Sequence, residues 1–336
     1  MTSQNITENF SKSPKISVML LTYNRAKLLP RAIKSVLNQT FGDFELVIVN
    51  NAATDNTGEI IQGFLGDNRI VYKKHEKNTG PFGGLNTALD TVTGKYVINL
   101  SDDDELLPDA LETISEKFDQ LSPKGIKILW FDCIDAETQR YSGSGIREEG
   151  YITYEDYLCN KFKGDYQVAM ERSVMGNIRF DQQSWGGMTT AYNLKCLHNN
   201  KAYHIPKIIG KLYREHGESR ITKAKTSLLN HIPKIVLTMK DFLKEFGEEI
   251  KKICPKQYGE RLASLGFYQI LNGEKQEGRI NILESLKFRF SLFHLFLFIF
   301  SFILNTGQLK YVCLLFFRIK ERISKFLKRF SKPITI

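Results

Sequence analysis

The amino-acid sequence predicts an α/β fold with a mostly parallel sheet, followed by a C-terminal helical region. Between residues 15 and 135, short apolar runs rich in β-branched residues alternate with amphipathic stretches of helical spacing. This alternation is typical of parallel sheets with helices on both faces. Three of the apolar runs end in polar, glycine-rich or acidic loops, which is where such sheets bind ligands. Residues 226–286, in contrast, show helical patterns only.

The expected elements follow one another in a regular order within residues 15–135. Five apolar runs predict strands, namely Ile16–Leu21, Phe44–Val49, Ile70–Lys73, Tyr96–Leu100 and Ile126–Phe131. Four stretches between them predict helices, namely Lys27–Leu37, a helix from the capping residues Thr54 and Asp55 through Phe64, Gly83–Thr91, and Pro108–Phe118. Residues 136–225 are less regular, because glycines interrupt them repeatedly.

Composition fits a folded protein of 336 residues. Hydrophobic residues make up 42% of the chain and charged residues 25%, which excludes wholesale disorder. The five cysteines form no CxxC pair, so the sequence argues against a zinc module or a disulfide framework and suits a reducing compartment. Residues 1–14 are polar, lack the apolar run of a signal peptide and are expected to be flexible.

The strongest chemical signal is a row of four acids, Asp102 to Glu105, directly after an apolar strand. Adjacent carboxylates repel one another, so a fold usually avoids such a row. A hard divalent cation bridged to phosphate oxygens explains it. The alternative is a solvated helix start, where acids interact favourably with the helix dipole.

Two other loops offer groups that suit a nucleotide. In the first, Tyr23 can stack on a base, while Thr22 and Asn24 offer short polar contacts. In the second, Asn50 and Asn51 follow the second strand and can contact a base edge or a ribose. Each loop taken alone is also compatible with an ordinary strand-to-helix turn.

Taken together, these pieces resemble the inverting family-2 glycosyltransferases, whose nucleotide-sugar-binding α/β fold is called GT-A. The matching pieces within 15–225 are Ile16–Arg25, Gln39–Phe41, Phe44–Thr57, Asn78–Gly80, Asn86, Thr93–Tyr96 and the acidic run ending at Pro108. The resemblance implies that the acidic run is the DXD-type motif, which binds the sugar-nucleotide diphosphate through Mn²⁺ or Mg²⁺. It implies metal ligation by Asp103 and Asp104, and donor nucleotide contacts from Thr22, Tyr23, Asn24, Asn51 and Asp102.

A last matching piece, residues 202–217, resembles the end of the family's catalytic domain. There the family often places a histidine near the metal, so His216 is expected as a ligand. Arg214 and Arg220 are expected to neutralise diphosphate charge. Trp185 is expected as a platform for the sugar ring. The alternatives are a surface histidine, solvated arginines and a packed aromatic.

Four departures from the family pattern concern the donor loops and the catalytic acid. The loop after the second strand carries amides, Asn50 and Asn51, where the family usually has an acid. Leu85 replaces a common arginine, and Ser101 replaces the first acid of the motif. The catalytic base should be an acid after Gly186-Gly187, yet Met188-Thr189 follows.

The missing acid leaves the identity of the base open. Inversion needs a carboxylate to take the acceptor proton. Asp181 is the nearest candidate in the sequence, with Glu171 and Asp165 behind it. Its alternative role is to cap the local turn. The same gap also keeps a non-catalytic, sugar-nucleotide-binding scaffold protein as an alternative. A nucleotidyltransferase is a third, less favoured reading, since no glycine-rich triphosphate loop followed by Lys is present.

The C-terminal tail, residues 287–336, carries most of the net charge of +10. From Lys287 onward ten Lys or Arg stand against one acid, Glu321. The charge accompanies many Phe and Leu residues, which predicts contact with an anionic membrane surface rather than with nucleic acid. The apolar stretch Phe290–Leu304 is shorter than the roughly 20 residues of a membrane span. The alternatives are a helix packed on the catalytic domain or on a second copy, and a true membrane span.

The sequence therefore predicts four parts: a flexible N-terminus (1–14), a GT-A domain (15–225), a helical domain (226–286) and a membrane-associating tail (287–336). The resemblance implies a metal-dependent hexosyl- or N-acetylhexosaminyltransferase, with a UDP-sugar as the favoured donor. A lipid-linked or envelope glycan, as in lipopolysaccharide or capsule assembly, is the expected acceptor. The expected location is the cytoplasmic face of a bacterial inner membrane, and a homo-oligomer stays open.

Overall fold

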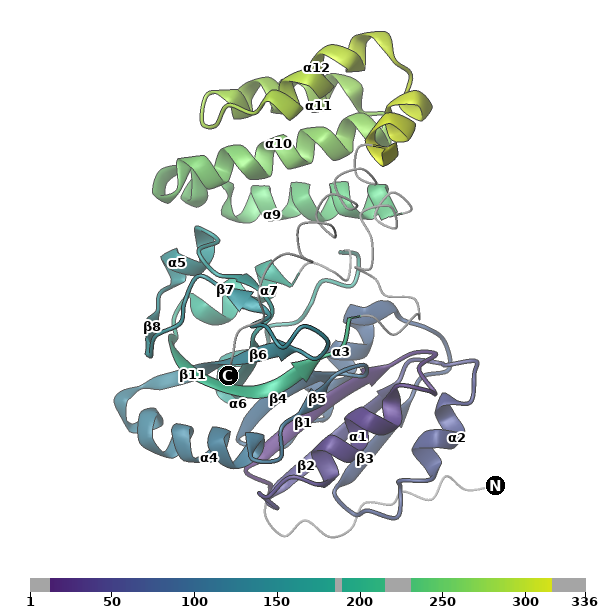
Figure 1. Ribbon diagram of the computed structural model, residues 1–336, viewed down its shortest axis with the longest axis vertical. Helices are drawn as coiled ribbons and strands as arrows, with labels where there is room; N and C mark the ends of the chain where they lie inside the picture. The colour runs from purple at the N-terminus through teal and green to yellow at the C-terminus, as the bar shows by residue number, and fades with distance from the viewer. Residues whose placement is uncertain (1–12, 185–188, 215–230, 316–336) are drawn as a thin grey trace. The chain divides into compact units, whose positions relative to one another are not determined.

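The computed structural model describes residues 13–184, 189–214 and 231–315 (Figure 1). The chain divides into two compact units. The first unit comprises residues 1–152, 164–180 and 196–214, and the second comprises 153–163, 181–195 and 215–336. Short segments of the middle of the chain thus belong with the C-terminal helices rather than with the sheet.

The first unit is built on a mixed, mostly parallel sheet. Its strand order is β3-β2-β1-β4-β10-β6-β11-β5, with β8 paired to β11. The strands are β1 (Ile16–Thr22), β2 (Phe44–Asn50), β3 (Ile70–Lys74), β4 (Tyr96–Ser101), β5 (Glu105–Leu106), β6 (Ile126–Asp135), β8 (Gly150–Ile152), β10 (Gln167–Glu171) and β11 (Lys201–Leu212). Two short strands, β7 (Gly143–Ser144) and β9 (Lys163–Gly164), lie outside this sheet. β1, β2, β3 and β4 run parallel, whereas β10 runs antiparallel to both β4 and β6.

Helices cover both faces of this sheet. They are α1 (Leu29–Leu37), α2 (Thr57–Gln62), α3 (Gly80–Thr91), α4 (Ala110–Leu121), the 3₁₀ turn η1 (Ser122–Lys124) and α6 (Arg172–Met175). Alternate residues of β1, such as Val18 and Leu20, form one apolar core with the buried faces of α1 and α4. Gly84 of α3 lies so close to Leu21 that an added Cβ would be 2.3 Å from its Cδ1. Since neighbouring strand residues point to opposite faces, α3 packs on the other side.

These elements confirm the fold class and every strand and helix predicted for residues 15–135. One boundary differs substantially, because β6 extends to Asp135 rather than ending at Phe131. The extension runs through Asp132, an acid that lies just beyond the predicted strand. Asp132 is only 2% exposed and pairs with buried His204, so the strand continues through it.

The second unit is mainly helical in its described part. Its long helices are α9 (Ile232–Ile253), α10 (Pro255–Asn272), α11 (Lys275–Leu286) and α12 (Leu292–Ile303), and residues 306–315 are also helical. The short helix α5 (Tyr154–Leu158) belongs to this unit, and α7 (Thr190–Leu197) begins in it. Leu158 and Leu194 share an apolar cluster with Phe242, Phe246 and Ile250 of α9. The helical region predicted from the sequence is therefore confirmed for residues 231–286.

A disulfide joins Cys159 to Cys254, with Cα atoms 5.5 Å apart. The cysteine spacing argues against a disulfide framework, and it does not predict this single bond. The two residues are 95 positions apart and belong to no spacing motif. They meet only because the end of α5 packs near the junction of α9 and α10, which sequence patterns do not reveal.

The apolar tail forms α12 and the helix 306–315 in its described part. Within the described ranges, no helix is both long enough and apolar enough to cross a membrane. Residues 316–336, which carry most of the predicted basic face, lie outside the described residues.

Candidate functional site

Three polar loops meet at the carboxyl edge of the parallel strands. The strand register places Thr22 of β1 beside Asn50 of β2, and Leu21 beside Ser101 of β4. The loops that follow these strands therefore start at the same level of the sheet. This is the arrangement expected for a ligand site at the ends of β1, β2 and β4.

The first two loops are tied together by hydrogen bonds. Asn24 adopts a positive φ of 53°, and its Oδ1 accepts a hydrogen bond of 2.7 Å from the backbone N–H of Thr54. The N–H of Arg25 donates to Oγ1 of Thr57 at 2.9 Å. Tyr23, which directly precedes these anchored residues, is 42% exposed. Its predicted role in stacking on a base is thus compatible with its position.

Asn51 is 2% exposed and acts as a hydrogen-bonding hub. Its Nδ2 donates to Oδ1 of Asn78 at 3.1 Å and to the carbonyl of Gly80 at 3.0 Å. Its Oδ1 lies 3.0 Å from both the N–H and the hydroxyl of Thr79, and 2.9 Å from Nδ1 of His75. The side chain therefore organises the turn that starts α3. Its part in binding a base stays a prediction.

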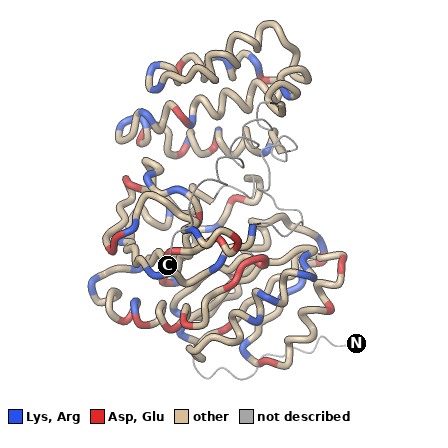
Figure 2. Tube along the Cα trace, in the orientation of Figure 1, with Lys and Arg blue, Asp and Glu red and all other residues tan. Residues whose placement is uncertain are grey.

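The acidic run, Asp102 to Glu105, follows the end of β4 in the first unit. Figure 2 marks the acidic residues of the described chain in red. Asp103 and Asp104 are 6% and 7% exposed, and Oδ1 of Asp104 accepts a hydrogen bond of 2.9 Å from the N–H of Tyr213. Burial raises the pKa of the Asp102 carboxyl to about 6, although the nearby Arg25 guanidinium, 3.7 Å away, opposes this shift. The run is therefore not the solvated helix start of the alternative reading.

The donor set of this loop fits Mn²⁺ or Mg²⁺. Such ions prefer oxygen ligands and are often held by one or two carboxylates together with substrate phosphates. Asp103 and Asp104 supply two neighbouring carboxylates at the sheet edge. In the described part of the chain, no group of three His, Cys, Asp or Glu side chains is arranged to hold a metal. A cation held here would therefore need other ligands, such as phosphate oxygens.

Arg214 lies just beyond β11 and bridges two carboxylates. Its Nη2 is 2.5 Å from Oδ2 of Asp165, and its Nε is 3.3 Å from Oδ2 of Asp135. Because β6 and β11 are parallel and Leu212 pairs with Asp135, this bridge also lies at a carboxyl edge. Contact of Arg214 with a diphosphate stays a prediction. The other residues expected around the diphosphate and sugar, Trp185, His216 and Arg220, lie outside the described residues.

Asp181, the expected base, is engaged in its own turn. Its Oδ1 accepts a hydrogen bond of 3.0 Å from the N–H of Gln183, and its Oδ2 accepts one of 2.7 Å from the hydroxyl of Ser184. It belongs to the second unit, whereas the acidic run belongs to the first. Its role as a base stays a prediction.

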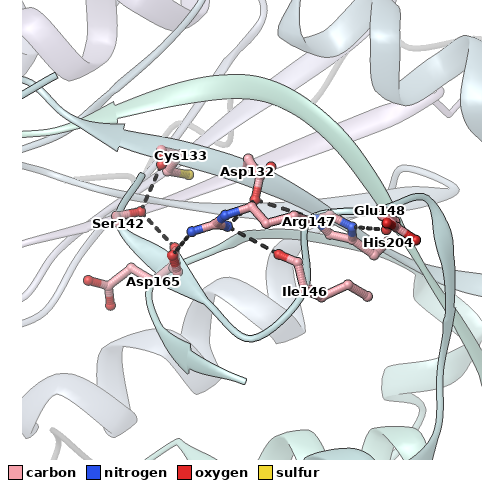
Figure 3. Close-up of polar contacts among 9 residues, drawn as sticks. Asp132, Cys133, Ser142, Ile146, Arg147, Glu148, Asp165 and His204 are labelled. Carbon is pink, nitrogen blue, oxygen red and sulfur yellow. Dashed lines mark hydrogen bonds and ion pairs between the residues drawn. The ribbon is translucent and has the colours of Figure 1, made fainter. Parts of the chain in front are cut away.

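A buried polar cluster that sequence reasoning missed lies on β6 and β11 (Figure 3). His204 is fully buried, with Nε2 3.4 Å from Oδ1 of Asp132 and Nδ1 2.8 Å from the carbonyl oxygen of Glu148. Nη1 of Arg147 is also 3.4 Å from Oδ1 of Asp132. The cluster holds the segment after β7 against the sheet. The only signal in the sequence was an isolated acid inside an apolar run.

Comparison with known proteins places this architecture among glycosyltransferases. The chain is 30% identical to a GalNAc(5)-diNAcBac-PP-undecaprenol beta-1,3-glucosyltransferase of Campylobacter jejuni over 257 residues, covering 75% of this chain and 80% of that protein. The crystal structure of Staphylococcus aureus TarS 1–349 with UDP-GlcNAc matches with a TM-score of 0.58 and 16% identity, covering 81% and 89% of the two chains.

A second solved structure has the same fold. The mannosyltransferase PcManGT from Pyrobaculum calidifontis, in complex with GDP-Man and Mn²⁺, matches with a TM-score of 0.51 and 15% identity over 88% of this chain and 81% of that one. The family model described as glycosyl transferase family 2 matches residues 17–192, more than half of the chain. The chain is a GT-A enzyme that belongs to glycosyl transferase family 2.

Proposed function

We propose that the protein is a metal-dependent inverting glycosyltransferase that uses a nucleotide-diphosphate sugar, with UDP-sugars favoured. The observation that carries this proposal is the buried pair Asp103 and Asp104 at the sheet edge where β1 and β4 end. Two adjacent carboxylates repel one another, and hard divalent cations prefer such oxygen ligands together with phosphate oxygens. A cation held by this pair and by the donor diphosphate would offset the repulsion between the two carboxylates.

The donor is expected to lie across the ends of β1, β2 and β4. Tyr23 would stack on the base, with Thr22, Asn24 and Asn51 shaping its pocket. Asp102 would contact the ribose. Asp103 and Asp104, with His216 as the third expected ligand, would hold Mn²⁺ or Mg²⁺, which when bound neutralises charge on the leaving diphosphate. Arg214 and Arg220 would add positive charge, and Trp185 would support the sugar.

The transfer itself is a single displacement. The acceptor hydroxyl oxygen forms a bond to the anomeric carbon on the face opposite the diphosphate, while the bond to the diphosphate oxygen breaks with its electron pair. The hydroxyl proton passes to a carboxylate, for which we propose Asp181. Its side chain would have to exchange a hydrogen bond of its own turn for the acceptor.

A lipid-linked glycan is the acceptor class that we propose. The Campylobacter relative is named for an undecaprenol-linked glycan, and the chain covers 80% of that protein. The TarS and PcManGT structures hold UDP-GlcNAc and GDP-Man, respectively, which supports a nucleotide-sugar donor without fixing its base.

The exposed apolar side chains of the tail support attachment of the enzyme to a membrane surface. In its described part, large apolar side chains are exposed, including Phe290 (64%), Leu292 (74%), Phe302 (60%) and Ile303 (73%). The basic residues that follow along the sequence suit anionic headgroups. We therefore propose peripheral attachment of residues 287–336 to the cytoplasmic face of a bacterial inner membrane.

Nucleotide release from a panel of UDP-, GDP-, dTDP- and CMP-sugars tests the proposed function. The protein is assayed in detergent with a bacterial lipid extract as acceptor source, with Mn²⁺ present or chelated. We expect release from one donor that is lost with chelator and in Asp103→Ala, but kept in Asp119→Ala, which removes an exposed acid on α4. Binding of a donor without release would instead favour the non-catalytic scaffold, which the Met188-Thr189 departure keeps open.

A further inference from the structure

Helix α1 presents a polar stripe to the backbone of the acidic run. Arg31 and Ser35 are four residues apart, so they lie on one face of the helix, and Gln39 continues this polar stripe two residues after the helix ends. Each of them hydrogen-bonds the backbone that follows β4. The contacts are Arg31 Nη2 to the carbonyl of Asp103, the N–H of Leu106 to Oγ of Ser35 at 3.2 Å, and Gln39 to the carbonyl of Leu107 at 2.7 Å and the N–H of Leu111 at 2.9 Å. This stripe sets the path of residues 103–111 along α1.

Arg31 also contacts Tyr213, which lies just after β11 and hydrogen-bonds the same acidic run. Its guanidinium carbon lies 3.4 Å from the centroid of the Tyr213 ring. Tyr213 in turn donates its backbone N–H to the carboxylate of Asp104 and its hydroxyl to Glu105, at 2.9 and 3.0 Å. The acidic run is therefore held on one side by α1 and on the other by the end of β11. The contact between Arg31 and the ring of Tyr213 joins these two elements.

The geometry requires arginine specifically. A planar guanidinium can stack on an aromatic ring while one of its N–H groups donates to a carbonyl, and the compact, more strongly hydrated ammonium of lysine does not reproduce that stacked contact. The Nε–H of Arg31 is buried and finds no acceptor among the described residues. An unsatisfied buried donor costs stability, so this placement is poorly explained by folding alone.

We propose that Arg31 is a positioning residue for the metal and diphosphate, a proposal that rests on the proposed function. It holds the backbone of Asp103 directly and the carboxylate of Asp104 through Tyr213. Mg²⁺, in particular, demands near-ideal octahedral geometry, so the relative position of two adjacent carboxylates decides its affinity. Arg31 keeps that position before the donor arrives.

A purely electrostatic role makes the opposite prediction. If Arg31 only placed a positive charge near the carboxylates, its removal would strengthen cation binding and Arg31→Lys would behave like the natural protein. If Arg31 positions the loop, both Arg31→Met and Arg31→Lys weaken cation binding. The two substitutions therefore separate charge from geometry.

The test measures binding of Mn²⁺ in the presence of UDP, and separately of GDP, from the loss of the free Mn²⁺ electron paramagnetic resonance signal. We expect Arg31→Met and Arg31→Lys to raise the Kd for Mn²⁺ by about tenfold or more, as for other residues that orient metal ligands. Tyr213→Phe keeps the ring and should bind as the natural protein does. Tyr213→Ala should weaken binding, and its effect should not add to that of Arg31→Met.

Arg69→Met is the matched control, because Arg69 also lies on an aromatic ring, 4.5 Å from the centroid of Phe44, away from the acidic run. It should lower the melting temperature without changing the Kd for Mn²⁺. If Arg31 variants lower the melting temperature but bind Mn²⁺ with nucleotide normally or more tightly, the positioning role is wrong and the proposed function survives. If the natural protein itself binds Mn²⁺ no better with UDP or GDP than Asp103→Ala does, the proposed function fails, and the positioning role with it.

Discussion

The carboxamide oxygen of Asn24 accepts a hydrogen bond of 2.7 Å from the backbone N–H of Thr54, which joins the loop after β1 to the loop after β2. Asn24 reaches this position by adopting a left-handed backbone conformation, with φ at 53°. Asparagine tolerates that region better than most residues, partly through local hydrogen bonds. The contact thus fixes the loop that carries the exposed side chain of Tyr23 against the loop after β2.

Replacing Asn24 separates the contribution of its hydrogen bond to Thr54 from that of its left-handed backbone conformation. Asn24→Gly keeps the backbone conformation and loses the hydrogen bond, which costs about 1 kcal/mol. Asn24→Ala loses the bond and also strains the backbone, for a total of about 2–3 kcal/mol. We expect both variants to raise the KM for the donor more than they lower kcat. The increase in KM should be larger for Asn24→Ala than for Asn24→Gly. Urea unfolding and donor titration measure the two effects, and equal behaviour of Gly and Ala would contradict the strain argument.

Substitution of Asp181 tests the proposed base. Asp181→Asn keeps the shape of the side chain but cannot accept the acceptor proton, so kcat should fall by about 10²–10⁴ while the KM for the donor changes little. Glu171→Gln serves as the control, because Glu171 pairs with Tyr96 at the start of β4, away from the carboxyl edge. If Asp165→Asn shows the large loss and Asp181→Asn does not, the base is the carboxylate beside Arg214 instead.

The buried Asp132 should contribute to stability rather than to catalysis. Asp132→Ala removes the acceptor that faces His204 and Arg147 and leaves a fully buried imidazole without this partner. We expect a loss of about 2 kcal/mol in the free energy of unfolding. Asp132→Asn, which can still accept a hydrogen bond, should lose less. Urea denaturation compares both with the exposed control Asp119→Ala, and a loss in Asp132→Ala no larger than in that control would contradict the buried role.

The parallel part of the sheet was predictable because its elements are local and periodic. Strands such as Phe44–Asn50 are apolar throughout, and the helix Leu29–Leu37 has regular apolar spacing, so each is specified by its own residues. The acidic run was also visible, since four consecutive acids after an apolar strand are rarely structural. What the sequence could not show depends on contacts between distant residues: the pairing of Asp132 with His204, the stack of Arg31 on Tyr213, and the bond between Cys159 and Cys254.

The disulfide makes a direct chemical prediction. Denatured, unreduced protein should take up iodoacetamide at Cys133, Cys196 and Cys313 only, and at all five cysteines after reduction. Because the bond closes a long loop, its loss should cost about 2–4 kcal/mol, so Cys159→Ser should lower the melting temperature. Cys133→Ser, at a buried free thiol, is the matched control. Alkylation of five cysteines without reductant would show that the bond does not form.

The exposed apolar side chains of α12 should drive attachment to vesicles. Leu292 and Ile303 are 74% and 73% exposed, and burying an apolar side chain in the interface is favourable in proportion to its area. We expect the full chain to float with vesicles that contain phosphatidylglycerol, more weakly with phosphatidylcholine alone, and less at high salt because the basic tail then contributes less.

The double substitution Leu292→Asp and Ile303→Asp should lower partitioning by about tenfold or more, since it removes two apolar contacts with the membrane and adds repulsion from the anionic lipid. Leu237→Asp, on α9 and 39% exposed, controls for a general effect of added charge. Equal flotation of all three proteins would mean that α12 does not enter the membrane and that its apolar face is covered by protein instead.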